Sequence, residues 1–71
     1  MLETYLPLYS SHIEKAAYET DTQDLTVTFK DGAEYVYRNV PQSVFDGLKK
    51  SRSAGEYFHR QIKGVYGYEE V

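Results

Sequence analysis

Positively charged side chains in the second half of the chain have the types and spacing that suggest chemistry. Five of the eight Lys and Arg residues fall within fifteen positions: Lys49, Lys50, Arg52, Arg60 and Lys63. Such side chains contact phosphate oxygens in complexes with nucleic acids. The more ordinary explanation is that a helix favours cations near its C-terminus and carries charge on its solvated face. The pattern therefore predicts either a phosphate-contacting patch or a solvated helical surface.

Groups that could support catalysis or bind a metal are few. The only histidines are His12 and His59, and the chain has no cysteine to complete a zinc site. A hydrolase would pair a histidine with a serine such as Ser10, Ser11 or Ser53, but no motif places such a pair together. A domain of 71 residues also has little room for a pocket that excludes water. We therefore expect a protein that is not an enzyme and has no metal or cofactor.

The overall composition limits the class of protein further. A chain of 71 residues predicts one domain, over 1–71. The absence of cysteine indicates a reducing compartment. The sequence also has no membrane-spanning apolar run and no basic segment typical of a secretory signal, so we expect a cytoplasmic protein without a membrane partner. The net charge of −3 argues mildly against a general nucleic-acid binder.

The centre of the chain predicts a β-hairpin. Apolar residues alternate with threonines over 25–29, and tyrosines alternate with other residues over 33–37. A two-residue turn at 31–32 would place Tyr35 and Tyr37 on the threonine face. A three-residue turn, with Gly32 in the left-handed conformation of a G1 bulge, gathers all five large apolar side chains on one face. Because register follows burial, we expect the bulged turn.

Tyr35 and Tyr37 have two candidate roles. They could form a stacking platform for unpaired bases. Alternatively, they could lie on the core face, paired with Val27 and Leu25. The bulged register favours the core, because a platform would leave the helices without an apolar surface on which to pack.

Two short helices are predicted after the hairpin, over 41–51 and 53–64. The period of the apolar residues changes from two to helical spacing at Pro41, which suits the first helical position. Gly47 weakens this helix by about 1 kcal/mol relative to alanine.

The second helix has a start signal and an apolar stripe. Ser53 and Glu56 fit a capping box, so the serine serves better as a cap than as part of an anion site. Gly64 or Gly67 ends the helix. The stripe comprises Ala54, Tyr57, Phe58, Ile62 and Val65.

The predicted fold class is α+β. We expect a three-stranded antiparallel meander, over 12–18, 24–30 and 33–38, with both helices packed on one face. The segment 1–11 is expected to be extended or irregular, with its leucines packed over an edge of the domain. The segment 68–71 is expected to be a tail.

The ordered set of these residues resembles the KTSC domain family over about 10–66. No single element is specific, but the set spans most of the chain: Ser11-x-Ile13, Tyr18, Leu25-x-Val27-x-Phe29, Gly32, Tyr35-x-Tyr37, Val40-Pro41, Val44-Phe45, Leu48, Ser53-x-Gly55-x-Tyr57-Phe58, Ile62 and Tyr66. The family usually has a small residue just before the serine of the second helix, where this chain has Arg52.

The resemblance implies a three-stranded meander followed by two helices, and it assigns no activity. Family members occur alone in bacteria and phages and at the C-terminus of some lysyl-tRNA synthetases, and this fusion suggests RNA as a partner. We therefore expect a non-catalytic binding module that contacts RNA through the five cations, with Tyr66 or Tyr68 stacking on a base. The alternative is a module that binds a protein partner or forms a homodimer, because a small sheet leaves strand edges exposed.

Overall fold

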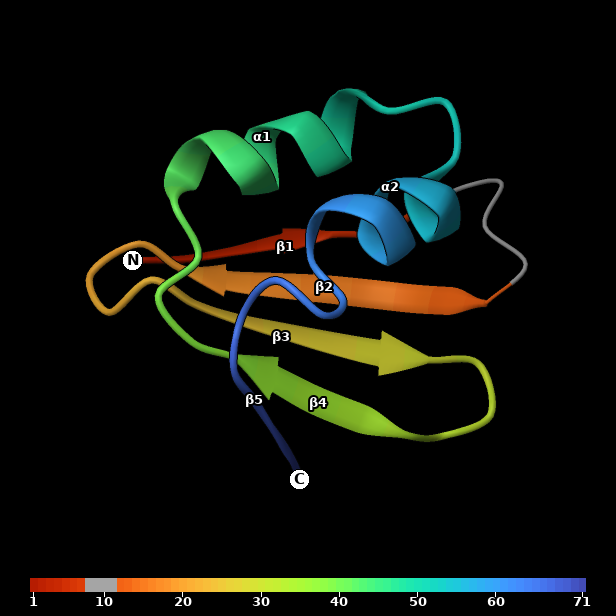
Figure 1. Cartoon of the computed structure of the whole chain (residues 1–71), viewed down its shortest axis with the longest axis horizontal. Coiled ribbons are helices and arrows are strands. Elements are labelled where there is room, and N and C mark those ends of the chain that lie inside the picture. Colours follow the sequence, from red (N-terminus) through yellow and green to blue (C-terminus); the bar gives the residue numbers. More distant parts are fainter. Residues whose placement is uncertain (8–11) are drawn as a thin grey trace.

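The computed structural model describes residues 1–7 and 12–71 of the chain (Figure 1). Its sheet has five antiparallel strands in the order β1-β2-β3-β4-β5. The elements are β1 (Leu2–Tyr5), β2 (Ile13–Glu19), β3 (Asp24–Phe29), β4 (Glu34–Tyr37), α1 (Gln42–Lys50), α2 (Ala54–Gln61) and β5 (Tyr68–Glu70). The fold class is α+β, as predicted, but the prediction of three strands was wrong, because one further strand pairs at each edge of the meander.

Both helices lie over one face of the sheet (Figure 1). Residues that alternate toward this face include Val27 of β3 and Tyr37 of β4, both buried. On the opposite face, the register aligns Thr4, Ala17, Thr26 and Val36 in one row across four strands. Within the described residues, no helix covers this second face, which is hereafter called the open face.

The first strand was missed because its apolar residues are not its buried ones. Leu2 and Leu6 are each 62% exposed, so the expectation that they pack over an edge was wrong, and Leu8 lies outside the described residues. The half-buried positions of β1 are instead Glu3 and Tyr5, which pair with β2 and lie on the helical side. In this segment the leucines are exposed and a carboxylate points inward. Hydrophobic alternation therefore does not indicate a strand here.

The predicted tail forms β5 and pairs with β4. Tyr35 lies opposite Glu70, and Tyr37 lies opposite Tyr68. Arg38 links this edge to the sheet, because its guanidinium donates to Asp24 on β3 at 2.8 Å and to Glu69 on β5 at 3.4 Å. All three β5 residues are exposed, so burial gave no signal for this strand.

The bulged hairpin is confirmed. Leu25 pairs with Tyr37 and Val27 with Tyr35, as the three-residue turn requires. Gly32 has φ 97°, in the left-handed region, and its N–H donates to the Phe29 carbonyl at 3.0 Å. Glycine is favoured at this position because a Cβ penalises positive φ. The register therefore places both tyrosines on the side of the helices.

The helix boundaries differ slightly from the prediction. Pro41 is the N-cap of α1 rather than its first helical residue. The second helix ends at Gln61, three residues before Gly64, because Ile62 already leaves helical geometry at φ −120°. Gly64 then turns the chain at φ 81°. Val65 lies in this turn and is 60% exposed, so its assignment to the apolar stripe was wrong.

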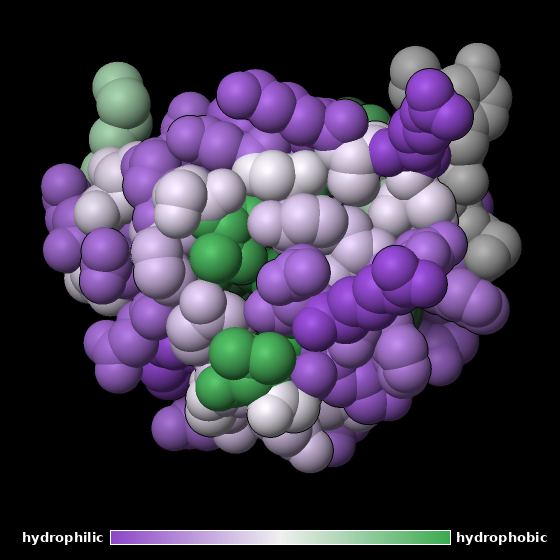
Figure 2. All heavy atoms as spheres, turned by 45° about the horizontal axis from the view of Figure 1, so that its top comes forward, coloured by the Kyte–Doolittle hydropathy of each residue, from purple (hydrophilic) through white to green (hydrophobic). Residues whose placement is uncertain are grey.

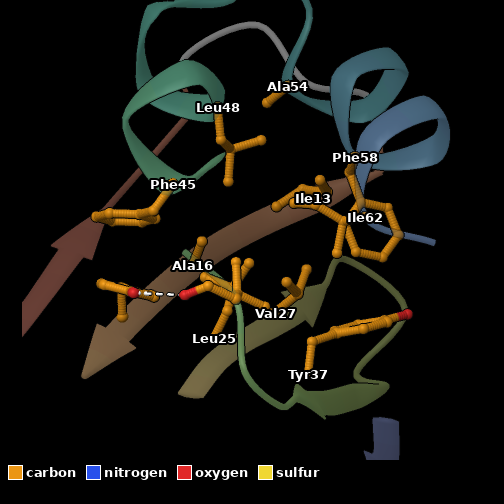
Figure 3. Packing of buried hydrophobic residues seen from close by; sticks show 12 residues of the cluster. Ile13, Ala16, Leu25, Val27, Tyr37, Phe45, Leu48, Ala54, Phe58 and Ile62 are labelled. Atoms are coloured by element: carbon orange, nitrogen blue, oxygen red, sulfur yellow. Dashed lines mark hydrogen bonds between the residues drawn. The ribbon is translucent and has the colours of Figure 1, made fainter. Parts of the chain in front are cut away.

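The core lies between the helices and the sheet (Figure 3). Its buried members are Ile13, Ala16, Tyr18, Leu25, Val27, Tyr37, Val40, Phe45, Leu48, Ala54, Phe58 and Ile62. The Tyr18 ring stacks on Phe45 with centroids 4.9 Å apart, and its hydroxyl donates to the Val40 carbonyl at 2.5 Å. This bond satisfies a polar atom that burial would otherwise leave without a partner.

Gly47 has a packing role in addition to its effect on helix propensity. A Cβ at this position would overlap the Tyr57 hydroxyl. The glycine therefore allows the tyrosine of α2 to pack closely against α1.

Candidate nucleic-acid interface

The five predicted cations are distributed over three places on the helical side of the molecule. Lys49 lies toward β1, where its ammonium is 3.5 Å from Asp46 and 3.8 Å from Glu3. The same ammonium lies 4.9 Å from the centre of the Phe45 ring. These contacts partly neutralise Lys49, whereas Lys50 beside it is exposed at the end of α1.

Arg52 and Arg60 are brought together at the corner between α1 and α2. They line one hollow of about 370 Å³, which is hereafter called the corner hollow. Its other lining residues are Ser51, Ser53, Glu56, Tyr57 and Gln61. Glu56 lies 3.0 Å from the Arg60 guanidinium, and the Ser53 hydroxyl accepts from the Glu56 N–H at 3.3 Å. The predicted serine cap is thus confirmed.

Lys63 lies just beyond α2, in a second hollow of about 220 Å³. The other residues that line it are aromatic: Phe29, Tyr35, Tyr37, Phe58 and Tyr68. This hollow is hereafter called the aromatic cleft. The basic window therefore supplies residues to two hollows, rather than forming one continuous patch, and the corner hollow extends along α2 as far as Gln61.

Charge is segregated between the helices and the rest of the chain. Residues 42–63 contain five cations and two carboxylates, a formal net charge of +3. The remaining residues contain three cations and nine carboxylates, a formal net charge of −6. Figure 2 shows that the helical side is mostly hydrophilic, with small apolar patches. The acidic total therefore conceals a locally basic surface.

The tyrosines proposed for stacking differ in exposure. Tyr68 is 58% exposed, whereas Tyr66 is half-buried and packs against the core. Tyr37 is only 3% exposed, and Tyr35 also packs against the core. The two hairpin tyrosines therefore have the core-facing orientation that the register predicted.

Tyr37 has a perturbed hydroxyl because of its surroundings. Burial raises the pKa of Tyr37, and the neighbouring Tyr68 and Tyr35 raise it further. In Figure 3 its ring lies beneath Phe58, and its hydroxyl points away from the core. Three phenol groups thus lie close together at the edge of the aromatic cleft. Sequence reasoning missed Phe29 and Phe58 as walls of this cleft, because their spacing indicates only core positions.

Other candidate groups remain apart from these hollows. His12 precedes β2 and His59 lies on α2, both exposed, while Ser10 and Ser11 lie outside the described residues. Across 1–7 and 12–71, no cluster of three or more potential metal ligands is found. No helix in these ranges is long and apolar enough to cross a membrane.

Comparison with known proteins places these features in a family. The KTSC domain profile matches residues 9–66. A lysine–tRNA ligase from Trichormus variabilis is 43% identical over 61 residues, which cover 86% of this chain but only 11% of the ligase. The chain thus corresponds to about a tenth of that protein. A protein from Tsukamurella paurometabola is 40% identical over 57 residues, covering 80% of this chain and 85% of its own length.

Structural comparison agrees with the sequence match. The crystal structure of a KTSC domain protein from Yersinia pestis has a TM-score of 0.87 and 26% identity, and the match covers 100% of this chain and 99% of that one. The extent of both matches includes the meander and both helices. The chain therefore belongs to the KTSC domain family.

Proposed function

We propose that the chain is a non-catalytic module that binds single-stranded RNA through its helical side. The observation that carries this proposal is the charge segregation, with +3 on residues 42–63 and −6 elsewhere. Such a distribution attracts an anionic polymer to the surface formed by residues 42–63 more than to the rest of the chain. The net negative charge of the whole chain then limits binding to a local footprint.

The corner hollow is the best candidate for phosphate contacts. Arg52 and Arg60 both line it, and a guanidinium presents several N–H donors in a plane that suits phosphate oxygens. Glu56 competes for Arg60, but this pair is exposed and such pairs are weak in water. A phosphate can therefore displace the carboxylate at small cost.

The relatives support RNA as the class of partner. Part of the lysine–tRNA ligase from Trichormus variabilis is 43% identical to this chain, and a ligase of that name acts on tRNA. A domain appended to such a protein has access to RNA without needing chemistry of its own. We extend this role to the present chain.

A titration monitored by NMR tests the proposal. Isotope-labelled protein is titrated with a tRNA pool and with single-stranded oligonucleotides at near-physiological salt. We expect amide shifts at Arg52, Arg60 and Lys63 that fade as salt rises, because phosphate contacts release counterions. Val36 and Thr26 on the open face serve as internal controls. Absence of shifts at hundred-micromolar nucleic acid would reject RNA binding.

A second candidate, association with a protein partner or with another copy, is favoured by the open face. Its central row of Thr4, Ala17, Thr26 and Val36 is uncharged across four strands, and Glu69 of β5 ends the row with a carboxylate. Sedimentation equilibrium at tens of micromolar tests a homodimer. A single species of 8.2 kDa throughout that range would exclude a stable one.

A further inference from the structure

We propose that the aromatic cleft binds one unpaired nucleobase, with Tyr68 as the stacking face and Lys63 contacting the adjoining phosphate. This inference rests on the proposed function, because it names where a base of the bound strand is held. The cleft contains both groups that such a ligand requires, an aromatic surface and a cation. The corner hollow also contains a ring and cations, but its ring, Tyr57, is half-buried and packs against α1, whereas Tyr68 in the aromatic cleft is 58% exposed.

Neighbouring rings hold Tyr68 in place. Its centroid lies 5.3 Å from that of Tyr37 and 5.6 Å from that of Tyr35. Phe29 and Phe58 continue the cluster, because Phe29 contacts both Tyr35 and Phe58 at 5.8 and 5.4 Å between centroids. Although Tyr68 is 58% exposed, its ring is therefore partly ordered before any ligand binds. Such preorganisation lowers the entropy cost of stacking.

The size and polarity of the cleft favour a single ring. Its volume of about 220 Å³ is below the range of about 300–1,000 Å³ that is typical of small-molecule sites. Its walls are aromatic, and three of the rings that line it, those of Tyr35, Tyr37 and Tyr68, carry a hydroxyl. An apolar site with a few hydroxyls suits a planar base whose edge forms hydrogen bonds.

The charge of Lys63 selects the kind of ligand. Tyrosine rings can also attract cations. A cation in this cleft would, however, lie close to the Lys63 ammonium, which lines the same space. A ligand that joins an anion to a planar ring suits both the Lys63 ammonium and the tyrosine rings. A nucleotide is such a ligand, because it joins a phosphate to a base.

The position of Lys63 also connects the cleft with the corner hollow. Arg60 lines the corner hollow and lies three residues before Lys63 at the end of α2. A strand that contacts Arg60 with one phosphate can therefore contact Lys63 with a later one. The two hollows then form one track, with the base held at its Tyr68 end.

The test compares a short oligouridylate with an abasic oligomer of the same length and phosphate count. Dissociation constants are measured for the intact protein and for Tyr68→Leu, Arg60→Gln and Tyr5→Leu. Tyr5→Leu is the matched control, because Tyr5 is also a helical-side tyrosine but lies on the opposite edge strand. We expect the intact protein to bind the oligouridylate at least about fivefold more tightly than the abasic oligomer, as stacking on an aromatic side chain provides.

The variants separate the two claims. Tyr68→Leu should abolish the preference for the base-containing oligomer, whereas Tyr5→Leu should retain it. Arg60→Gln should weaken both oligomers alike and reduce the salt dependence. Equal affinity of the intact protein for both oligomers would overturn the base-binding cleft while leaving phosphate binding intact. Absence of binding to either oligomer would overturn both proposals.

Heteronuclear NMR spectra of each variant establish that it is folded. If Tyr68→Leu disturbs β5, the variant Tyr68→Phe replaces it and should retain the preference, since phenylalanine also stacks. A loss of preference in a folded Tyr68→Phe protein would show that the ring does not act by stacking and would overturn that role.

Discussion

Two aromatic clusters in this small protein use the same residue type in opposite ways. Tyr18 and Phe45 stack in the interior, each 0% exposed, and the Tyr18 hydroxyl donates to the Val40 carbonyl. Tyr37 and Tyr68 also contact each other, but their cluster opens at the edge of the sheet beside Lys63. The first cluster is closed and internally satisfied, and the second is open to a ligand.

The difference shows that aromatic content alone does not distinguish a core from a binding surface. Tyrosine serves both purposes, because its ring is apolar and its hydroxyl is polar. The two clusters differ in two respects. The Tyr18 hydroxyl has a hydrogen-bond partner within the core, and the outermost ring of the other cluster, Tyr68, is exposed. Substitutions in each cluster and a change of pH test this contrast.

Removal of one ring from each cluster should affect stability very differently. We expect Phe45→Ala to lower the free energy of unfolding by about 3–5 kcal/mol, because it leaves a cavity under Tyr18. Tyr68→Ala should cost about 1 kcal/mol or less, since its ring is mostly exposed. Urea denaturation followed by circular dichroism measures both.

A protein of this size has little stability to lose, so Phe45→Leu is included as a milder change. We expect it to cost about 1–2 kcal/mol. Equal losses for the Phe45 and Tyr68 substitutions would remove the distinction between a closed and an open cluster.

Removal of a single hydroxyl should distinguish the clusters again. Tyr18→Phe leaves the buried Val40 carbonyl without its donor and should cost about 1–3 kcal/mol. Tyr37→Phe should change stability by about 0.5 kcal/mol or less, because its hydroxyl points away from the core in Figure 3. The same denaturation measurement applies. A large loss of stability in Tyr37→Phe would indicate that the Tyr37 hydroxyl also has a hydrogen-bond partner within the protein.

Tyr57 sharpens the comparison, because it packs against α1 on one side and lines the corner hollow on the other. Helix propensity alone predicts that Gly47→Ala stabilises the protein by about 1 kcal/mol. We expect it instead to destabilise by about 1 kcal/mol, because the new methyl group would overlap the Tyr57 hydroxyl. In a Tyr57→Ala background the same change should become stabilising. Additive effects in the double mutant would show that the two residues do not interact.

Alkaline pH should weaken the folded state. Burial raises the pKa of Tyr18 and of Tyr37 above the ordinary value of 10.0. As pH rises past that value, these tyrosines ionise in the unfolded chain before they do so in the folded protein. The unfolded chain then binds fewer protons, so stability is fully present below about pH 10 and falls as pH rises further.

The neighbours of Tyr37 allow a finer test. Tyr68 contributes to its raised pKa, whereas the contributions of charge at Tyr18 come from Asp46 and Glu3. The substitution Tyr68→Phe should therefore bring the pKa of Tyr37 closer to its ordinary value without changing that of Tyr18. Titration of the tyrosine ring carbons by NMR measures both groups. An unchanged Tyr37 would contradict the proximity of the three hydroxyls.

The sequence predicted the interior of this fold better than its edges. The register of β3 and β4 followed from Gly32 and from the need to bury Val27 with Tyr35. The edge strands gave no such signal. Leu2 is exposed on β1 while Glu3 is half-buried, and β5 consists of three exposed residues. Such edge strands form because their backbone pairs with an existing sheet. The pattern of hydrophobic residues does not indicate this pairing.

The candidate site was predictable as a set of residues but not as an arrangement. The window from Lys49 to Lys63 identified the cations, yet Lys49 lies beside Glu3, which is distant in sequence. The aromatic cleft depends on β5, because Tyr68 reaches Tyr37 only through that unpredicted strand. Because β5 pairs with β4, Tyr68, which was expected in a tail, lines the aromatic cleft.

The most direct test of the open cluster follows aromatic ring protons by NMR during titration with a short oligouridylate. We predict that the rings of Tyr68 and Tyr35 shift and show contacts with base protons, while the buried rings of Tyr18 and Phe45 remain unchanged. The abasic oligomer should shift amide signals near Arg60 without moving the Tyr68 ring. Shifts at Tyr18 equal to those at Tyr68, or binding of the oligouridylate without any change at the Tyr68 ring, would contradict this account.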